Sequence, residues 1–177
     1  MARDTLINAV LFQVLWFASV IVGGVHGLLW PCVVASVVLL ASVWPTPERM
    51  RDVLLASVLV PIGWALDTVW AVFGVLDFDG APLAPLWIAT LWFGVALSVN
   101  HSLKIFRDNA LIGSLVVGAF APFSYFGGSK LGAVSIPALA PLGAIAIAWF
   151  VLFYLVFRFS ADRAGDESPV APTVATD

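Results

Sequence analysis

Apolar residues run almost without interruption from residue 5 to residue 43. A helix needs about 20 apolar residues to cross the roughly 30 Å hydrocarbon core of a bilayer, so this run is too long for one span and fits two. Over the whole chain, 62% of the residues are hydrophobic and 11% are charged, against about 45–50% and about 25% in ordinary soluble domains. The pattern predicts an all-α, polytopic membrane protein. It excludes a soluble enzyme, a disordered chain and a nucleic-acid-binding protein.

Short polar or glycine-rich segments divide the chain into six expected transmembrane helices. Gly23-Gly24-Val25-His26-Gly27 interrupts the first run, and glycines of this kind provide the tight turn of a helical hairpin. Residues 160–177 are rich in Asp, Glu, Pro, Ala and Thr without a periodic apolar face, so we expect a disordered cytoplasmic tail after a transmembrane domain of residues 1–159. We expect spans at about 5–22, 25–43, 53–76, 86–103, 110–126 and 136–157.

Lys and Arg are divided unevenly between the two ends of these spans. If the N-terminus is cytoplasmic, seven of the eight fall on the cytoplasmic side and only Lys130 falls on the other. Short cytoplasmic loops carry such an excess of positive charge. This predicts a six-helix bundle with both termini in the cytoplasm. The seven are Arg3, Arg49, Arg51, Lys104, Arg107, Arg158 and Arg163.

Asp67 is the one charged side chain that falls well inside an expected span. A carboxylate there costs at least a few kcal/mol, so such a residue is a functional candidate by default. It lies about 21 Å along its span at 1.5 Å per residue, in the outer half of the membrane. Tyr125 and Lys130 start from the same outer end, and a lysine stem can bend toward a carboxylate. We therefore expect an outward-facing binding pocket of Asp67, Tyr125 and Lys130, walled by Trp64 and Trp70.

Small residues accompany Asp67 on one face of its helix. Gly63, Asp67, Trp70 and Gly74 have the spacing i, i+4, i+7 and i+11, and small residues let a second helix approach closely. Asp67 should therefore face protein. One alternative stays open: a structural, neutral aspartate bonded to Thr90 or to a backbone carbonyl, with the lysine left in water.

A second polar group lies at the inner end of the fourth expected span. Asn100 and His101 lie near the end of that span, and Asn8 of the first span has a similar depth. We expect these three residues to form an inner cluster, either with a chemical role or as a helix end that meets headgroups and water. His26 and His101 lie on opposite sides of the membrane, and Cys32 is the only cysteine. We therefore expect no metal site and no cofactor.

Two further features remain open. Pro122 and Gly127-Gly128 flank an aromatic run in the fifth span, which either forms a broken helix lining a small cavity or ends the span with an aromatic anchor. Gln13 lies inside the first span, where an amide usually joins helices by hydrogen bonds.

Short polar and aromatic motifs lie along the whole chain except the tail. They are Asn8 with Phe12-Gln13 and Trp16-Phe17; Gly63 and Asp67; Pro85-Leu86-Trp87-Ile88 with Leu91-Trp92-Phe93; Asn100-His101-Ser102-Leu103; and Pro122, Ser124-Tyr125 and Gly132-Ala133. Together they resemble the domain of unknown function 2878 family of bacterial inner-membrane proteins. The family has no established activity. Its members tend to be encoded near lipid-modifying enzymes, including cyclopropane-synthase-like methyltransferases, and this association implies a lipid-related accessory role.

Three classes of function fit these observations. We favour a non-enzymatic accessory protein that binds a lipid or a partner protein, because the loops are short and no catalytic motif is present. The alternatives are a small proton- or cation-coupled transporter that uses Asp67, and a membrane-embedded lipid-modifying enzyme with Asp67 or His101 as acid or base. The expected partners are membrane lipid and a protein partner or a second copy. Nucleic acid is excluded by a net charge of −3.

Overall fold

The computed structural model describes residues 2–166, and most of this part of the chain is helical. It contains one isolated β-bridge, between Asp77 and Ser135, and no strand. The all-α class predicted from the apolar runs is therefore confirmed. The helices are α1 (Ala2–Phe17), the π-helix η1 (Ala18–Val25), α2 (Leu29–Val43), α3 (Arg49–Val72), α4 (Leu86–Val99), the 3-10 helix η2 (Lys104–Phe106), α5 (Ala110–Lys130) and α6 (Leu142–Asp166).

Within the described residues, four helical segments are long and apolar enough to cross a bilayer. α2 and α4 are apolar but have 15 and 14 residues, which is about 22 and 21 Å at 1.5 Å per residue and less than the roughly 30 Å core. The chain is therefore a helical membrane protein, while six complete crossings remain a prediction. The first long segment, Arg3–Val25, consists of α1 and η1 together. The other three are Arg49–Val72, Ala110–Lys130 and Leu142–Ser160.

The glycine turn predicted after the first span is misplaced. The helix continues through Gly23 and Gly24 as η1, and the chain turns at Gly27, whose φ is +68°. A Cβ at Gly23 would overlap Trp87, and a Cβ at Gly24 would overlap Ala133. The first two glycines therefore permit close packing of this helix, and only the third serves the turn.

The last predicted span is shifted along the chain. α6 begins at Leu142 rather than at residue 136, because residues 131–141 form a loop that contains two prolines and one side of the β-bridge. α6 continues to Asp166, past the predicted domain boundary at residue 159. The first part of the predicted tail is therefore helical, and residues 167–177 lie outside the described part of the chain.

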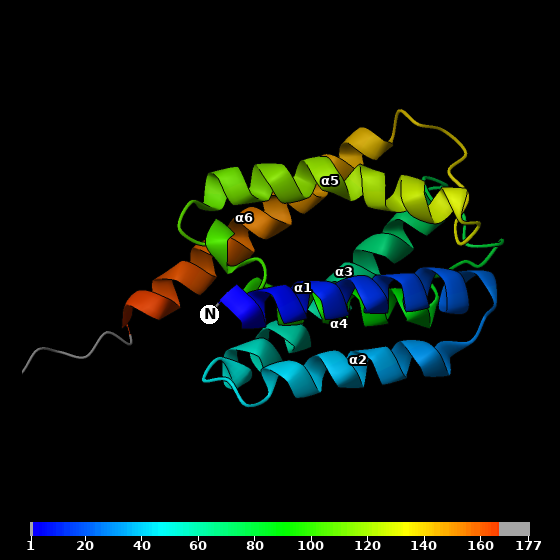
Figure 1. The fold of residues 1–177 in the computed structure, drawn as a ribbon. Helices are drawn as coiled ribbons and strands as arrows, with labels where there is room; N and C mark the ends of the chain where they lie inside the picture. The colour runs from blue at the N-terminus through cyan, green and yellow to red at the C-terminus, as the bar shows by residue number, and fades with distance from the viewer. Residues whose placement is uncertain (1, 167–177) are drawn as a thin grey trace, which may run out of the picture.

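The helices form two groups. α4 packs against α3, α2 and α1, and α5 packs against α6. Figure 1 shows the α5–α6 pair lying across the group that contains α1, α2 and α4, with successive helices running in opposite directions. The N-terminus, the 44–48 turn and the 100–109 segment therefore lie at one end of the bundle, and the 73–85 and 131–141 loops lie at the other.

α4 is the central helix. Side chains on all its faces are buried, including Trp92, Leu97 and Val99, as expected for a helix that is hydrophobic all round. The non-helical segment after it is also tied to protein, because the backbone N–H groups of His101 and Leu103 donate to the carbonyl of Ser98. Irregular backbone near the membrane is stable only where such partners replace water.

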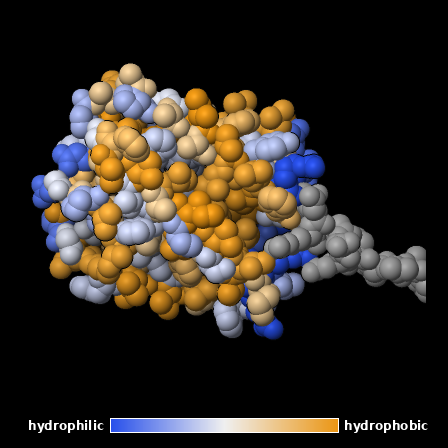
Figure 2. Space-filling model, turned by 180° about the vertical axis from the view of Figure 1, so that it is seen from behind, coloured by the Kyte–Doolittle hydropathy of each residue, from blue (hydrophilic) through white to orange (hydrophobic). Residues whose placement is uncertain are grey.

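The outer surface matches a membrane environment. Figure 2 shows apolar residues across the middle of one face and hydrophilic residues gathered toward its two ends. Large exposed apolar side chains occur on every α-helix, among them Val37 of α2, Phe120 of α5 and Ile147 of α6. Apolar patches of this extent mark a surface that lipid or another protein covers.

Candidate functional site

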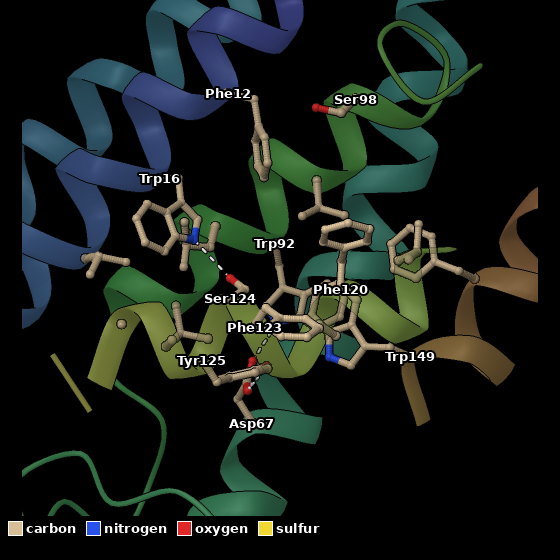
Figure 3. A pocket seen from close by; sticks show the side chains of 18 of the residues that line it. Phe12, Trp16, Asp67, Trp92, Ser98, Phe120, Phe123, Ser124, Tyr125 and Trp149 are labelled. Atoms are coloured by element: carbon tan, nitrogen blue, oxygen red, sulfur yellow. Dashed lines mark hydrogen bonds between the residues drawn. The ribbon is translucent and has the colours of Figure 1, made fainter. Parts of the chain in front are cut away.

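A cavity of about 540 Å³ lies between the α5–α6 pair and helices α1, α3 and α4. Small-molecule sites in proteins typically have volumes of about 300–1,000 Å³. The wall consists mainly of apolar and aromatic side chains, and Asp67 is the one charged residue among the described residues that line it. Figure 3 shows aromatic rings from several helices converging here, with Asp67 and Tyr125 on one side of the space.

Asp67 of α3 is held by two neutral donors. Trp92 of α4 donates from Nε1 to Oδ2 at 2.7 Å, and Tyr125 of α5 donates from its hydroxyl to Oδ1 at 2.5 Å. The carboxylate is 1% exposed although it borders the cavity. This residue therefore joins three helices that belong to both groups of the bundle.

Gly63 makes the contact between α3 and α4 possible. It lies one turn before Asp67 on the same face of α3, and a Cβ at this position would overlap the indole ring of Trp92. Without a side chain at Gly63, the Trp92 ring packs directly against the α3 backbone and brings its N–H to the carboxylate. The small-residue face predicted around Asp67 thus accommodates an indole ring.

The cavity has a mouth between α1 and α5. Gln13 and Ser124 line the cavity and are exposed, as are Phe120 and Phe123, at 68% and 69%. One hydrogen bond crosses the mouth, from Trp16 Nε1 to Ser124 Oγ at 3.0 Å, and Figure 3 shows it above the Asp67 pair. The aromatic side chains at the mouth are therefore continuous with the apolar outer surface of the bundle.

Trp149 of α6 forms part of the opposite wall. Its ring stacks on Trp92 at 4.6 Å between centroids and on Phe153 at 5.5 Å, and it meets Tyr125 edge-on. Its indole N–H is buried and has no hydrogen-bond partner among the described residues. These ring contacts are of the kind that stabilise aromatic pairs, and they hold the Trp149 ring in the wall.

A polar cluster lies near the other end of α4. Asp52, in the first turn of α3, is 1% exposed. His101 Nε2 shares a hydrogen bond with Asp52 Oδ2 at 2.8 Å, and Asn100 Nδ2 donates to Oδ1 at 2.9 Å. Arg107 donates in turn to Asn100 Oδ1 at 3.0 Å. The cluster fixes the start of α3 against the end of α4.

Asn8 of α1 secures the same segment from another side. Its Nδ2 donates to the carbonyl of Leu97 at 3.2 Å, and its Oδ1 accepts from the backbone N–H of Ser102 at 3.2 Å. Asn8 therefore satisfies backbone groups on both sides of Asn100 and His101.

No group of three His, Cys, Asp or Glu side chains among the described residues is placed to hold a metal ion.

The comparison with protein families decides where the chain belongs. A family model described as a protein of unknown function, DUF2878, matches residues 5–155. The chain belongs to the DUF2878 family. The match includes every residue of the Asp67 contacts and of the polar cluster. No curated protein and no solved structure matches this DUF2878 chain.

The structure of this DUF2878 protein brings together only part of the predicted outer pocket. Asp67 and Tyr125 are in direct contact, but the Lys130 ammonium lies 5.1 Å from the ring centroid of Phe126 and forms no ion pair with Asp67. The expected ion pair is absent because Lys130 ends α5, about 7.5 Å of helix rise beyond Tyr125, the residue that contacts Asp67. The predicted tryptophan walls also lie elsewhere, because neither Trp64 nor Trp70 lines the cavity.

The two tryptophans have different surroundings. Trp64 Nε1 donates to the carbonyl of Ala84 at 2.8 Å, so it secures the loop before α4. The indole N–H of Trp70 is buried without a partner among the described residues. Thr90, the alternative partner considered for Asp67, instead bonds with Ser19 and with the carbonyl of Trp87.

The predicted inner cluster of the DUF2878 protein comes together around a residue that the prediction omitted. Asn8, Asn100 and His101 lie at the same end of the bundle, as expected, and Asp52 joins two of them. Asp52 falls between the expected spans 25–43 and 53–76, although it belongs to the first turn of α3. The fifth helix also runs through Pro122 to Lys130 without ending, and this stretch lines the cavity.

Proposed function

We propose that this protein binds a membrane lipid in the cavity and acts as an accessory protein in the inner membrane of a bacterium. In this proposal all six helices cross the membrane and both termini lie in the cytoplasm. The observation that carries the proposal is a cavity of about 540 Å³ with an apolar wall and an exposed mouth between α1 and α5. A protein partner or a second copy of the chain stays a prediction.

The composition of the wall supports a lipid chain as the occupant. Apolar residues such as Val95, Val117 and Phe153 supply most of the lining. Burial of apolar surface contributes about 25 cal/mol per Å², and a ligand with few polar atoms leaves no polar group unpaired in such a wall. The single charged lining residue is already bonded to Trp92 and Tyr125.

The position of the mouth supports entry from the membrane. Phe120 and Phe123 are exposed on the lipid-facing side of α5 and also line the cavity. A lipid chain can therefore pass between α1 and α5 without leaving the hydrocarbon region. The bond between Trp16 and Ser124 is the only polar contact that the described residues place across this opening.

The experiment measures lipid that copurifies with the protein. The wild-type protein in mild detergent should carry a lipid detectable by native mass spectrometry. Ala121→Phe should lower the bound fraction several-fold, because Ala121 is buried in the cavity wall and the larger ring fills the space. Val117→Phe, in the same wall, provides a second test if the first variant folds poorly.

A matched control is available on the same helix. Ala119 of α5 is exposed and does not line the cavity, so Ala119→Phe should retain the wild-type lipid occupancy. Equal occupancy in the wild type, both wall variants and the control would show that the lipid binds the outer surface, and the proposal would then be wrong.

A second candidate function rests on the contact between Tyr125 and Asp67. A hydroxyl bonded to a carboxylate is an acid–base pair, and both residues line the cavity. The pair would allow an enzyme to transfer a proton to or from a bound lipid. Incubation of the protein with total membrane lipids, followed by lipid mass spectrometry, distinguishes the two functions. Chemical conversion that Tyr125→Phe abolishes would favour the enzyme, and unchanged lipid favours the accessory role.

A further inference from the structure

Given the proposed lipid site, we infer that its ligand is an uncharged lipid with a hydrogen-bonding oxygen near the middle of the membrane, where Gln13 and Ser124 contact it. This inference deepens the proposed function, because it specifies the chemistry of the lipid. Three features of the mouth and the wall carry it.

The first feature is an unpaired amide at the mouth. Gln13 is exposed, lines the cavity and has no hydrogen-bond partner among the described residues. An unpaired amide in an apolar medium is unfavourable, because it loses the hydrogen bonds that water would provide. The predicted role of Gln13 as a link between helices of one chain does not apply here. The amide therefore requires a partner from outside the chain.

The second feature is a hydroxyl with a free hydrogen. Ser124 Oγ accepts from Trp16, and its own O–H donates to no acceptor among the described residues. A ligand oxygen at the mouth can accept this hydrogen, while the Gln13 amide can donate a second one. Both groups belong to neutral side chains, so they fit a carbonyl, ester or ether oxygen.

The third feature is the depth of these groups. At about 1.5 Å per residue, Gln13 lies about 15 Å from Arg3, the start of its long apolar segment, and Trp16 lies about 20 Å from it. Ser124 lies about 21 Å from the start of α5. In a roughly 30 Å core, Gln13 is therefore near the middle, and Trp16 and Ser124 are in the outer half, about 9–10 Å from the outer headgroups. A phospholipid chain would bring only methylene groups to this level.

The charges of the cavity exclude ionic ligands. No Lys, Arg or His is among the described lining residues, so an anionic group would find no countercharge. Asp67 is 1% exposed and its oxygens already accept hydrogen bonds from Trp92 and Tyr125, so a cation would have to displace one of these donors to pair with it. Transfer of an unpaired charge into such a site is strongly unfavourable.

The experiment compares probes of equal chain length on the full-length protein in nanodiscs. A tritiated long-chain ketone with a mid-chain carbonyl is the labelled ligand, and the competitors are the ketone itself, the alkane, the carboxylate and the quaternary amine. The ketone should compete about two- to tenfold better than the alkane, which is the contribution of one neutral hydrogen bond. The carboxylate and the amine should compete least.

Variants identify the groups that recognise the oxygen. Gln13→Leu should remove most of the preference for ketone over alkane and leave alkane binding unchanged, and Ser124→Ala should reduce the preference in the same direction. Val14→Leu is the matched control, because Val14 is exposed on the same helix and does not line the cavity. It should keep the full preference.

Each outcome has a distinct meaning. If no probe binds the wild type or any variant, both the lipid-binding proposal and this inference fail. If alkane and ketone bind equally, the lipid site stands and the inference fails. Tighter binding of the amine or the carboxylate overturns the inference, and so does loss of a dimer in Gln13→Leu with an unchanged ketone preference, because Gln13 would then contact a second copy.

Discussion

At the scale of single residues, Asp67 and Asp52 are two buried carboxylates stabilised without a bonded Lys or Arg. Asp67 accepts from an indole and a phenol, and Asp52 accepts from an amide and shares a hydrogen bond with an imidazole. Removal of one partner from such a group leaves a buried acceptor unpaired, with a cost of about 1–3 kcal/mol. Each carboxylate thus stabilises contacts between helices that are distant in the sequence.

Asp67 and Tyr125 should be energetically coupled. Asp67→Asn and Tyr125→Phe should each lower the free energy of unfolding by about 1–3 kcal/mol. Tyr125→Phe leaves Asp67 Oδ1 without its donor, and Asp67→Asn replaces one accepting oxygen by an amide NH2 group that cannot accept. The double variant should lose less than the sum of the two single losses, by at least about 0.5 kcal/mol. SDS titration of the purified protein in mixed micelles measures these values.

Lys130 supplies the matched comparison for this cycle. Its ammonium lies over Phe126 and is not paired with Asp67, so Lys130→Gln should add to Asp67→Asn within about 0.5 kcal/mol. Coupling between Asp67 and Lys130, with additivity between Asp67 and Tyr125, would contradict the geometry described above.

At the scale of helices, the approach of α3 to α4 depends on the absence of a side chain at Gly63. Trp92 occupies the space that a Cβ would fill, and the same indole donates to Asp67. The packing of two helices and the hydrogen bond at the cavity therefore depend on one position. The short length of α4 is compatible with this central place, because protein surrounds it.

Gly63→Ala should destabilise the protein more than an ordinary helix substitution. The added methyl group would force the Trp92 ring away from α3 and weaken its bond to Asp67, so the free energy of unfolding should fall by about 1–3 kcal/mol. Trp fluorescence should change at the same time, and SDS titration measures the stability.

The control is Gly143→Ala in α6. Gly143 is exposed in the first turn, and a Cβ there would meet no atom within 4 Å. Alanine should leave stability unchanged or raise it by up to about 1 kcal/mol, because it favours the helix over glycine. Equal effects at both glycines would show that the Trp92 contact does not limit stability.

At the scale of the whole molecule, the alternating directions of the helices separate the basic residues between the two ends of the bundle. Arg49, Lys104 and Arg107 lie at the end that holds the N-terminus, whereas Lys130 lies at the other. The distribution matches the pattern expected for a cytoplasmic and an external end. The proposed orientation and the even number of crossings both depend on it.

Cysteine labelling should reach the two ends from opposite sides of the membrane. Asp79 and Asp108 are both exposed, and they belong to loops at opposite ends of the bundle. In intact bacterial cells, a membrane-impermeant maleimide should label Asp79→Cys at once and Asp108→Cys only after permeabilisation. The native Cys32 is buried and should not react. Labelling of both positions in intact cells would exclude the proposed topology.

The sequence by itself determined the all-α class and the approximate positions of the helices, because hydropathy depends on local composition. It also singled out Asp67 as a candidate functional residue, because a charged side chain inside an apolar span is visible in the sequence. It also indicated that Asn8, Asn100 and His101 share one end of the bundle, since helix rise converts residue number into depth. The tertiary structure alone decided the partners. Trp92 rather than Lys130 lies against Asp67, and Asp52 lies under His101, because these contacts depend on how helices rotate and cross. The cavity was also decided by the tertiary structure alone. It forms where the α5–α6 pair meets the other helices, and no single segment of the sequence encodes it.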